Sequence, residues 1–454
     1  MNKAFYSSPA FIFILSLFSA GVASAQTSDI SPYSRYGIGD LQAQNSVLNF
    51  SMGGTGIAYH NDASTPFFVN LKNPASYAYG FVPIEDSAGT GGLKMAAFEA
   101  GLQDNILNLS SQGQSASSNN AYLAYVALNI PISRHFGIAM GLTPVSTEGY
   151  NITTNSAVDS DGVPSKTIVQ NNYQGTGGIS KVFLGAAYAP CKNLSIGANV
   201  SYLFGNLTNT EDIIFPDPNA FYTLKAENVG IHSFSSDFGV MYTLYLVKNL
   251  EHPEKNWSVT FGATIAPSVN LTANYNILTV SQSYSGINMD TLQDSGAVGK
   301  IRIPMMWGAG ITIKKGDSWT FSFDHTVQNW SQFSYFGQTE NLSSSYTYGV
   351  GIQYVPKKDF PKTYAQRVHY RIGYSYSLNY LDLYNTPLID RSFSAGIGLP
   401  IGFSNAYEHP AVINIAVKVG SMGTSTNNLL LENYVQLMFG FTFDDHWFDK
   451  RKFN

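Results

Sequence analysis

The chain has 454 residues, of which 12% are charged and 14% are aromatic, and its formal net charge at pH 7 is −5. Soluble domains carry about twice that share of charged residues, so the composition argues against a water-soluble protein of this size. The acidic balance argues against a nucleic-acid partner, and the single cysteine, Cys191, excludes internal disulfides.

The N-terminus has the pattern of a secretory signal peptide. Lys3 supplies a positive charge, residues 10–22 form an apolar run, and Ala23-Ser24-Ala25 has the small-x-small pattern that signal peptidase reads. The alternative is a membrane anchor, but the apolar run is short for a spanning helix. We therefore expect residues 1–25 to be a cleaved signal peptide. No later run of about 18 apolar residues predicts a membrane-spanning helix.

Residues 26–92 are rich in turn-forming residues, too long for a linker and too rich in glycine for a helical domain. The glycine cluster lacks the Lys-Ser/Thr step and the strand–helix frame of a phosphate loop. We interpret it as a site of tight packing, and the whole segment as a hatch, or plug, inside a barrel lumen. The hatch residues that we single out are Gly53, Gly54, Gly56, Asn73, Pro74 and Ala75.

Residues 93–443 alternate with a period of two. In residues 194–205, for example, apolar side chains occupy every second position from Leu194 to Phe204, with polar or small residues between most of them. Successive side chains of a strand point to opposite faces, so each such segment has an apolar face and a polar one. A soluble β-sandwich alternates too, but strands of about ten residues with aromatic ends favour a transmembrane barrel. The expected strands are 93–104, 120–132, 135–148, 178–190, 194–205, 234–247, 257–266, 301–313, 319–331, 343–355, 365–379, 391–402, 411–422 and 431–443.

The connections between these strands alternate in length. The gaps after even-numbered strands are mostly short, whereas gaps 105–119, 149–177 and 206–233 are long and polar, and a fourth, 267–300, either is a loop or extends its neighbouring strands. Outer-membrane barrels have short periplasmic turns and long outer loops. We therefore predict an all-β, antiparallel transmembrane barrel of about 14 strands in a Gram-negative outer membrane. Residues 444–454 form a charged, aromatic tail that we place in the periplasm.

Several of these segments resemble a known family. Residues 52–58, residues 61–64 and Asn73-Pro74-Ala75 resemble the hatch of the FadL/TodX outer-membrane transporters of fatty acids and hydrocarbons. Further likeness lies in residues 141–144, 193–197, 330–333 and 370–374. The resemblance implies a monomeric, passive channel that contacts outer-membrane lipid and carries hydrophobic or amphipathic small molecules.

The chain also departs from the family pattern. Ten residues lie between Asp62 and Asn73, and the charged tail is foreign to the family's best-known members. Some relatives of this fold serve protein secretion. The alternative function is therefore a barrel that anchors or assists an outer-membrane protein-secretion complex.

The sequence offers no catalytic constellation. His325 and His369 are isolated and lack metal-ligand spacing, and no Gly-x-Ser-x-Gly elbow stands in a strand-to-helix frame. We expect no enzymatic activity, no metal and no cofactor, with an outer-membrane lipase or protease as the alternative.

Four ionisable residues fall on the lumen face by strand parity. These are Lys181, Asp324, Arg371 and Lys418. One interpretation is a network of paired charges that fills the barrel, since buried charges are normally paired. The other is that Arg371 or Lys418 binds the carboxylate of an amphipathic ligand.

Pro144 lies inside the third predicted strand. Proline has no N–H to donate, so a strand that contains it should kink or lose a ladder bond there. FadL-like channels are thought to release ligand sideways through a gap in the wall, which makes Pro144 the candidate for a lateral gap. The alternative is that the strand has already risen above the membrane, where water compensates for a missing bond.

Overall fold

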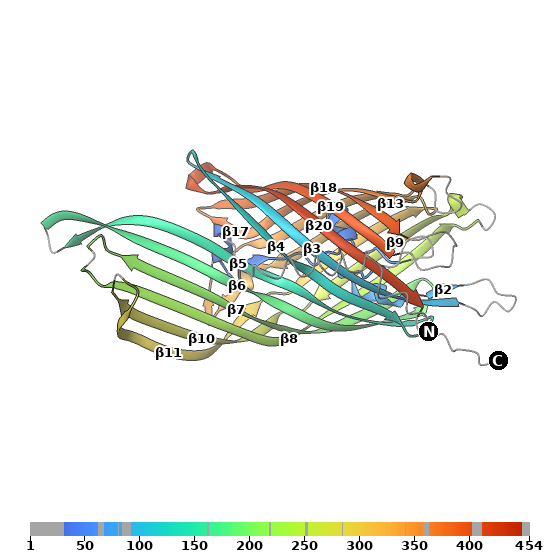
Figure 1. The fold of residues 1–454 in the computed structure, drawn as a ribbon. Coiled ribbons are helices and arrows are strands. Elements are labelled where there is room, and N and C mark those ends of the chain that lie inside the picture. The colour runs from blue at the N-terminus through green and yellow to red at the C-terminus, as the bar shows by residue number, and fades with distance from the viewer. Residues whose placement is uncertain are drawn as a thin grey trace, which may run out of the picture.

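The structure is a computed structural model that describes residues 31–446 apart from 62–67, 80, 84–91, 161–162, 218, 250–252, 284, 341, 357–362 and 402–410. Within this part, fourteen antiparallel strands close into a barrel (Figure 1), because the last strand pairs with the first. All fourteen predicted strands are present. The barrel strands are β3 (Gly92–Ser111), β4 (Gln114–Pro131), β5 (Phe136–Ser160), β6 (Val163–Cys191), β7 (Leu194–Ile214), β8 (Tyr222–Val247), β9 (Trp257–Ala266), β12 (Met306–Lys315), β13 (Trp319–Asn329), β16 (Ser344–Tyr354), β17 (His369–Leu383), β18 (Thr386–Ile401), β19 (Ala411–Gly423) and β20 (Leu431–His446).

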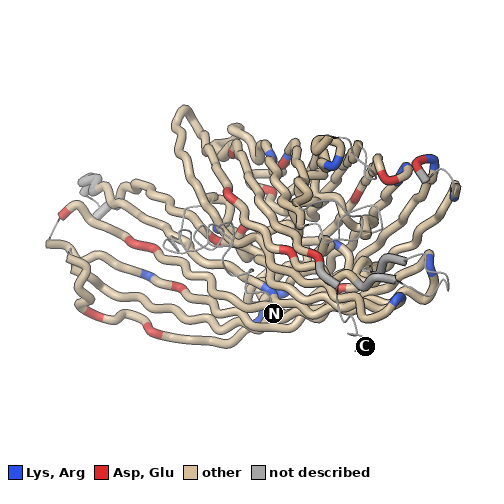
Figure 2. The backbone as a smooth tube through the Cα atoms, turned by 45° about the vertical axis from the view of Figure 1, so that its right-hand side comes forward, with Lys and Arg blue, Asp and Glu red and all other residues tan. Residues whose placement is uncertain are grey.

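The outward face of the barrel is apolar and the inward face is polar, the reverse of a water-soluble sheet. In β7, Ile196 and Val200 are 49% and 59% exposed, whereas the neighbouring Ser195 and Ser201 are buried. Such exposure of aliphatic side chains is costly in water and favourable against lipid. The charged residues are correspondingly sparse along the strands (Figure 2).

The prediction of outer loops at 105–119, 149–177 and 206–233 is wrong, because the strands continue through most of each segment. β3 and β4 run on to a tight turn at Gln112-Gly113, where both residues have positive φ. Positive φ at both central positions is the signature of a two-residue hairpin turn. The ends of β5 to β8 likewise extend far beyond the predicted strands. Polar residues occupy both faces in these extensions, so the apolar alternation that predicted the strands is absent there.

The fourth gap forms a hairpin of its own. Its strands are β10 (Val269–Gln282) and β11 (Asn288–Ile303), and β10 pairs with the outer half of β8. Together with the extended ends of β5 to β8, this hairpin forms a sheet that projects well past the other strands (Figure 1, left). β11 pairs with the short strand β14 (Ser334–Tyr335), which in turn pairs with β15 (Gln338–Thr339). We call this end of the barrel the outer end, and the end with the short turns the turn end.

Residues 31–61 and 68–79 lie inside the ring of strands, as the blue ribbon in Figure 1 shows. Their elements are η1 (Pro32–Arg35), β1 (Asp40–Leu41), α2 (Val47–Ser51) and η2 (Pro74–Tyr79), and β2 (Phe81–Pro83) follows against β3. We call residues 31–61 and 68–79 the N-terminal segment. The short helix α2 begins with a capping box between Ser46 and Asn49, and all five of its residues are buried. Among the described residues, no helix is long and apolar enough to cross a membrane.

Two predictions concern the chain ends. The predicted signal peptide, residues 1–25, lies outside the described residues. The tail was expected to start at residue 444, but β20 continues to His446 and pairs with β3 throughout; residues 447–454 lie outside the described part.

Candidate functional site

The N-terminal segment is seated on inward-facing glycines of the wall. A Cβ atom on Gly373 would lie 2.0 Å from the backbone nitrogen of Gly53, and one on Gly262 would lie 2.1 Å from the carbonyl oxygen of Ile57. Gly53 itself has a φ of +69°, and a Cβ there would meet the carbonyl oxygens of two wall strands. Backbone therefore packs directly on backbone, which only glycine permits.

Asn73-Pro74-Ala75 is seated in the same way. Asn73 donates from Nδ2 to the carbonyl oxygen of Ile57 at 2.7 Å and approaches that of Val240 at 3.3 Å. A Cβ on Gly197 would clash with the backbone of Pro74. The six residues predicted from the sequence to form a hatch thus lie in the N-terminal segment. Of these, Gly53, Gly56, Asn73, Pro74 and Ala75 contact the wall.

Asp324 binds the N-terminal segment. Its Oδ2 accepts hydrogen bonds from the backbone N–H groups of Gly56 at 2.7 Å and Ile57 at 2.9 Å. Hydrogen bonds to an ionised group are stronger than neutral ones. The partners of Asp324 are therefore backbone N–H groups. Neither a network of paired side-chain charges nor a ligand site, the two interpretations from the sequence, included this role.

Arg371 is held by neutral side chains. It is 4% exposed, and it donates from Nε to Gln353 at 2.7 Å and from Nη1 to Asn414 at 2.8 Å. Gln353 in turn donates to the Tyr59 hydroxyl of the N-terminal segment at 3.1 Å. A guanidinium fixed on both edges leaves little room for a ligand carboxylate. The two histidines have no metal-like setting either: His325 stacks on Tyr348, and no metal-binding group of three side chains occurs among the described residues.

Lys418 lines a cavity of about 180 Å³ at the outer end of the lumen. The cavity lies between residues 31–50 and the inner faces of β3, β4 and β18 to β20. Three carboxyl groups, those of Asp40, Asp390 and Glu432, line it as well. Burial and the nearby carboxylate of Asp390 raise the pKa of Asp40 to about 6.

These three carboxyl groups are not among the site residues predicted from the sequence. Glu432 lies within a predicted strand on the face opposite Leu437 and Phe439, so parity alone would have placed it in the lumen. Asp390 precedes the predicted strand by one residue, and Asp40 lies in a segment without regular alternation. No local pattern brings the latter two together.

The wall opens between β4 and β5. Their ladder runs only from Pro131↔Gly137 to Val126↔Leu142, although both strands continue past it. Pro144 lies two residues beyond the last pair, and a β-bulge interrupts the β5–β6 register between Pro144 and Ser146. The break therefore begins where proline removes a donor, and we call it the β4–β5 break.

Residues 40–44 of the N-terminal segment occupy the β4–β5 break. β1 pairs with β5 at Thr147 and Ser146. Gln42 bridges the two edges, because its Oε1 accepts from Tyr122 of β4 at 2.8 Å and its Nε2 donates to Thr147 of β5 at 3.0 Å. Gln44 donates to the Pro144 carbonyl oxygen at 2.7 Å. These contacts make residues 40–44 a closure of the opening.

Lys181 is next to the same opening. It pairs in register with Thr143, one residue before Pro144, and its side chain is half-buried. The structure thus brings Lys181 and Pro144 together at the β4–β5 break, while Lys418 lies in the neighbouring cavity. Asp324 contacts another part of the N-terminal segment, and Arg371 is linked to that segment only through Gln353.

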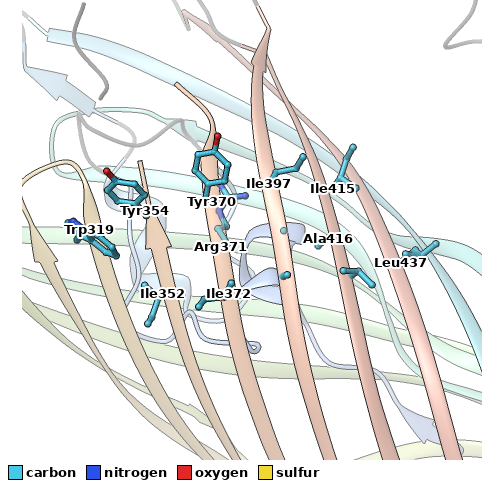
Figure 3. Close-up of a pocket in the computed structure, with 13 residues that line it drawn as sticks. Trp319, Ile352, Tyr354, Tyr370, Arg371, Ile372, Ile397, Ile415, Ala416 and Leu437 are labelled. Atoms are coloured by element: carbon cyan, nitrogen blue, oxygen red, sulfur yellow. The ribbon is translucent and has the colours of Figure 1, made fainter. Parts of the chain in front are cut away.

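A second hollow, of about 520 Å³, lies on the outward face of β13 and β16 to β20 (Figure 3). Its sides are aliphatic, with Ile352, Ile372 and Ile397, and Trp319, Tyr354 and Tyr370 stand together near the strand ends. Aromatic residues next to an aliphatic surface are typical of the membrane–water interface. This hollow therefore belongs to the lipid-facing surface and not to the lumen.

Comparison with known proteins agrees with this geometry. A family model described as BamG matches residues 8–454. No curated protein gives a significant match.

Solved structures share the fold at low sequence identity. The Ralstonia pickettii toluene transporter TbuX is 15% identical over 89% of this chain and 99% of its own, with a TM-score of 0.54. A Pseudomonas aeruginosa FadL homologue is 12% identical over 90% and 100%, with a TM-score of 0.54. The Pseudomonas putida toluene transporter TodX is 14% identical over 90% and 100%, with a TM-score of 0.52. The fold is therefore that of FadL-like outer-membrane barrels, and the apolar belt is the surface that such barrels present to lipid.

Proposed function

The chain belongs to the BamG family, and we propose that it is a passive outer-membrane channel for hydrophobic or amphipathic small molecules. The observation that carries this proposal is the β4–β5 break, closed by residues 40–44 and not by a neighbouring strand. A sideways exit lets an apolar solute pass from the lumen into the membrane without crossing bulk water, where its transfer is unfavourable.

Movement of residues 40–44 is the step that opens the path. Their bonds to β5 include the two β1 pairs and the backbone bond from Gln42 to Val145. The side chains of Gln42 and Gln44 add bonds to Thr147, Pro144 and Thr143, and each bond contributes about 1 kcal/mol. The rest of the N-terminal segment is held by the wall glycines and by Asp324, so residues 40–44 can leave while the hatch stays in place. The proposal assigns no catalytic step and no cofactor to the chain.

Uptake by intact cells tests the proposal. The chain is expressed in a Gram-negative host that lacks its own FadL-type channels, and entry of labelled toluene and of a long-chain fatty acid is measured. We expect faster entry of at least one of them than in cells with an empty vector. Unchanged entry of both, with the barrel folded in the outer membrane, would overturn the proposal.

One observation favours a second candidate, an accessory of a protein-secretion complex. Along residues 288–299, β11 pairs with β10 alone among the described residues, and its Met289, Leu292 and Val298 are 55%, 59% and 75% exposed. A free strand edge with exposed apolar side chains is suited to pairing with another chain. Cross-linking in cells from position 289 decides this candidate: capture of one secretion protein favours it, and recovery of the uncoupled chain argues against it.

A further inference from the structure

Three carboxyl groups, together with amide and hydroxyl side chains, line the lumen cavity beside residues 40–44. Asp40, Asp390 and Glu432 contribute carboxyl groups, and each accepts one side-chain hydrogen bond. Tyr434 donates to Asp390 at 2.6 Å, Gln42 donates to Asp40 at 3.1 Å, and Ser31 donates to Glu432. A carboxylate has about four acceptor sites, so most of the capacity of these three groups is unused.

A fourth acceptor points to a missing donor independently of the carboxyl groups. The Asn45 side chain lines the same cavity and is 6% exposed, and its Oδ1 has no hydrogen-bond partner among the described residues. A buried amide oxygen without a donor costs about 1–3 kcal/mol. A ligand that donates hydrogen bonds would remove this cost.

Lys418 is the one cation among the residues that line the cavity, and it forms no direct ion pair with their carboxyl groups. Its Nζ lies 4.8 Å from the centre of the Phe50 ring, in a cation–π contact. None of the described carboxylates lies within ion-pair distance of it. Three carboxyl groups therefore share one ammonium group that is not bound directly to any of them.

We propose that this cavity binds the ammonium group of an amphipathic amine. The carboxyl groups and the Asn45 oxygen accept its N–H bonds, while Lys418 keeps its contact with the Phe50 ring. Leu41, Leu107 and Met422 line the cavity beside the first methylene groups. Leu41 also belongs to β1 at the β4–β5 break, so the alkyl chain points towards the proposed exit.

The same chemistry disfavours a fatty acid. A carboxylate in this cavity would face three acidic groups and find Lys418 as its only charged partner. Like charges at short distance are unfavourable, and less screened inside a protein than in water. Lys418 thus acts as a competitor of the ligand's ammonium group, the reverse of the carboxylate-binding role that the sequence suggested for it.

Calorimetric titration of the purified, folded barrel with hexylamine, hexanoate and hexanol tests this inference at neutral pH. These ligands share one alkyl chain and are soluble, so their differences report the head group. We expect hexylamine to bind at least tenfold more tightly than hexanoate, the scale of one charge-assisted hydrogen bond. Absence of hexylamine binding, equal affinities, or tighter binding of hexanoate would each overturn the inference.

Variants assign the binding to the cavity. Asp390→Asn should weaken hexylamine at least tenfold, with Glu432→Gln as the second variant if the first does not fold. Lys418→Met should strengthen hexylamine binding, whereas a carboxylate site would lose hexanoate in this variant. Asp294→Asn, on the exposed part of β11, is the matched control and should change nothing. Loss of affinity in the control, or none in Asp390→Asn and Glu432→Gln, contradicts the inference.

This inference rests on the proposed function only for the biological role of amine binding, and not for the binding itself. Binding is measured on the purified barrel without transport, whereas uptake of toluene, which carries no charge, is measured separately in cells. Failure of amine binding with intact toluene uptake removes the head-group site alone. Failure of all uptake with intact amine binding removes the channel proposal alone.

Discussion

The seam that closes the barrel and the seam between β4 and β5 join strands of similar length in very different ways. Between β20 and β3, sixteen residue pairs follow one another without a register shift. Between β4 and β5, six pairs are followed by an opening. Every residue of the first seam has a backbone N–H group that can donate to the ladder. Pro144, next to the end of the second seam, has none. A wall opening can therefore be built into a closed barrel by one residue that cannot donate and a bulge that turns its strand.

The N-terminal segment shows the same contrast. Residues 52–57 and 73–77 sit on wall glycines, in backbone contacts that admit no extra methyl group. Residues 40–44 are attached by two strand pairs and a few side-chain bonds to the edge of β5. We call residues 52–57 and 73–77, with the wall glycines beneath them, the fixed seat, and residues 40–44 the movable closure. Substitutions should affect the two parts independently.

The largest effect is expected from Gly373→Ala, which disrupts the packing of residues 52 and 53 on the barrel wall. The new Cβ would lie 2.0 Å from the Gly53 nitrogen, and neither backbone is free to move. Overpacking of this kind costs about 3 kcal/mol. Hydrogen–deuterium exchange of residues 52–59 should accelerate by roughly a hundredfold on that scale. Gly230→Ala is the control, because its Cβ meets only the end of the Asn206 side chain, at 3.1 Å. Equal acceleration of exchange in both variants would contradict the claim that packing on Gly373 holds residues 52–59.

Asp324→Ala should have a smaller effect on the same residues. It removes the acceptor of the Gly56 and Ile57 N–H groups, a loss of about 2 kcal/mol for buried, charge-assisted bonds. Exchange at these two amides should accelerate, while β1 keeps its protection. Asp324→Asn retains an oxygen acceptor and should fall between the variant and the wild type. Loss of protection at β1 as well would mean that the seat and the closure are one unit.

The smallest effect concerns the closure and its response to pH. Asp40 faces Asp390, Glu432 and Lys418 across the cavity, and its pKa of about 6 exceeds the ordinary value of 3.8. The folded state therefore binds the proton more tightly, so protonation favours the docked segment and this contribution is lost as pH rises from about 4 through 6. Exchange of β1, corrected for its intrinsic pH dependence, should accelerate roughly tenfold between pH 5 and pH 7, a change of about 1 kcal/mol. Asp40→Asn should abolish the pH dependence, and its persistence in that variant would exclude Asp40 as the cause.

Local alternation was enough to predict the barrel strands, because lipid on one face and the lumen on the other impose a period of two. The signal failed above the membrane, where water meets both faces. The extensions of β5 to β8 were consequently assigned to loops, and the segment of the β10–β11 hairpin was predicted to be either a loop or an extension of its neighbouring strands. Pro144 was informative because the chemistry of its missing N–H does not depend on distant residues.

The lumen charges were harder to interpret. Parity placed Asp324 and Arg371 on the inward face, but Asp324 binds backbone groups more than 200 residues away in sequence, and Arg371 binds side chains of two other wall strands. Likewise, the carboxyl groups around Lys418 come from β1, β18 and β20. Only the closed barrel brings these elements together, so neither the pairing of Lys418 nor the polarity of its cavity follows from any local pattern.

A reversible lock on the closure tests the central claim most directly. Leu41 and Ser146 are partners in the β1–β5 register, and cross-strand partners lie within the reach of a disulfide. Both are changed to cysteine in a Cys191→Ser background, which removes the exposed native thiol. The control pair is Ser281→Cys with Asp290→Cys, partners in the β10–β11 hairpin far from the opening. The account predicts that oxidation stops hydrocarbon uptake in the first variant, that reduction restores it, and that the control transports in both states; undiminished uptake by the fully oxidised Leu41–Ser146 lock would contradict it.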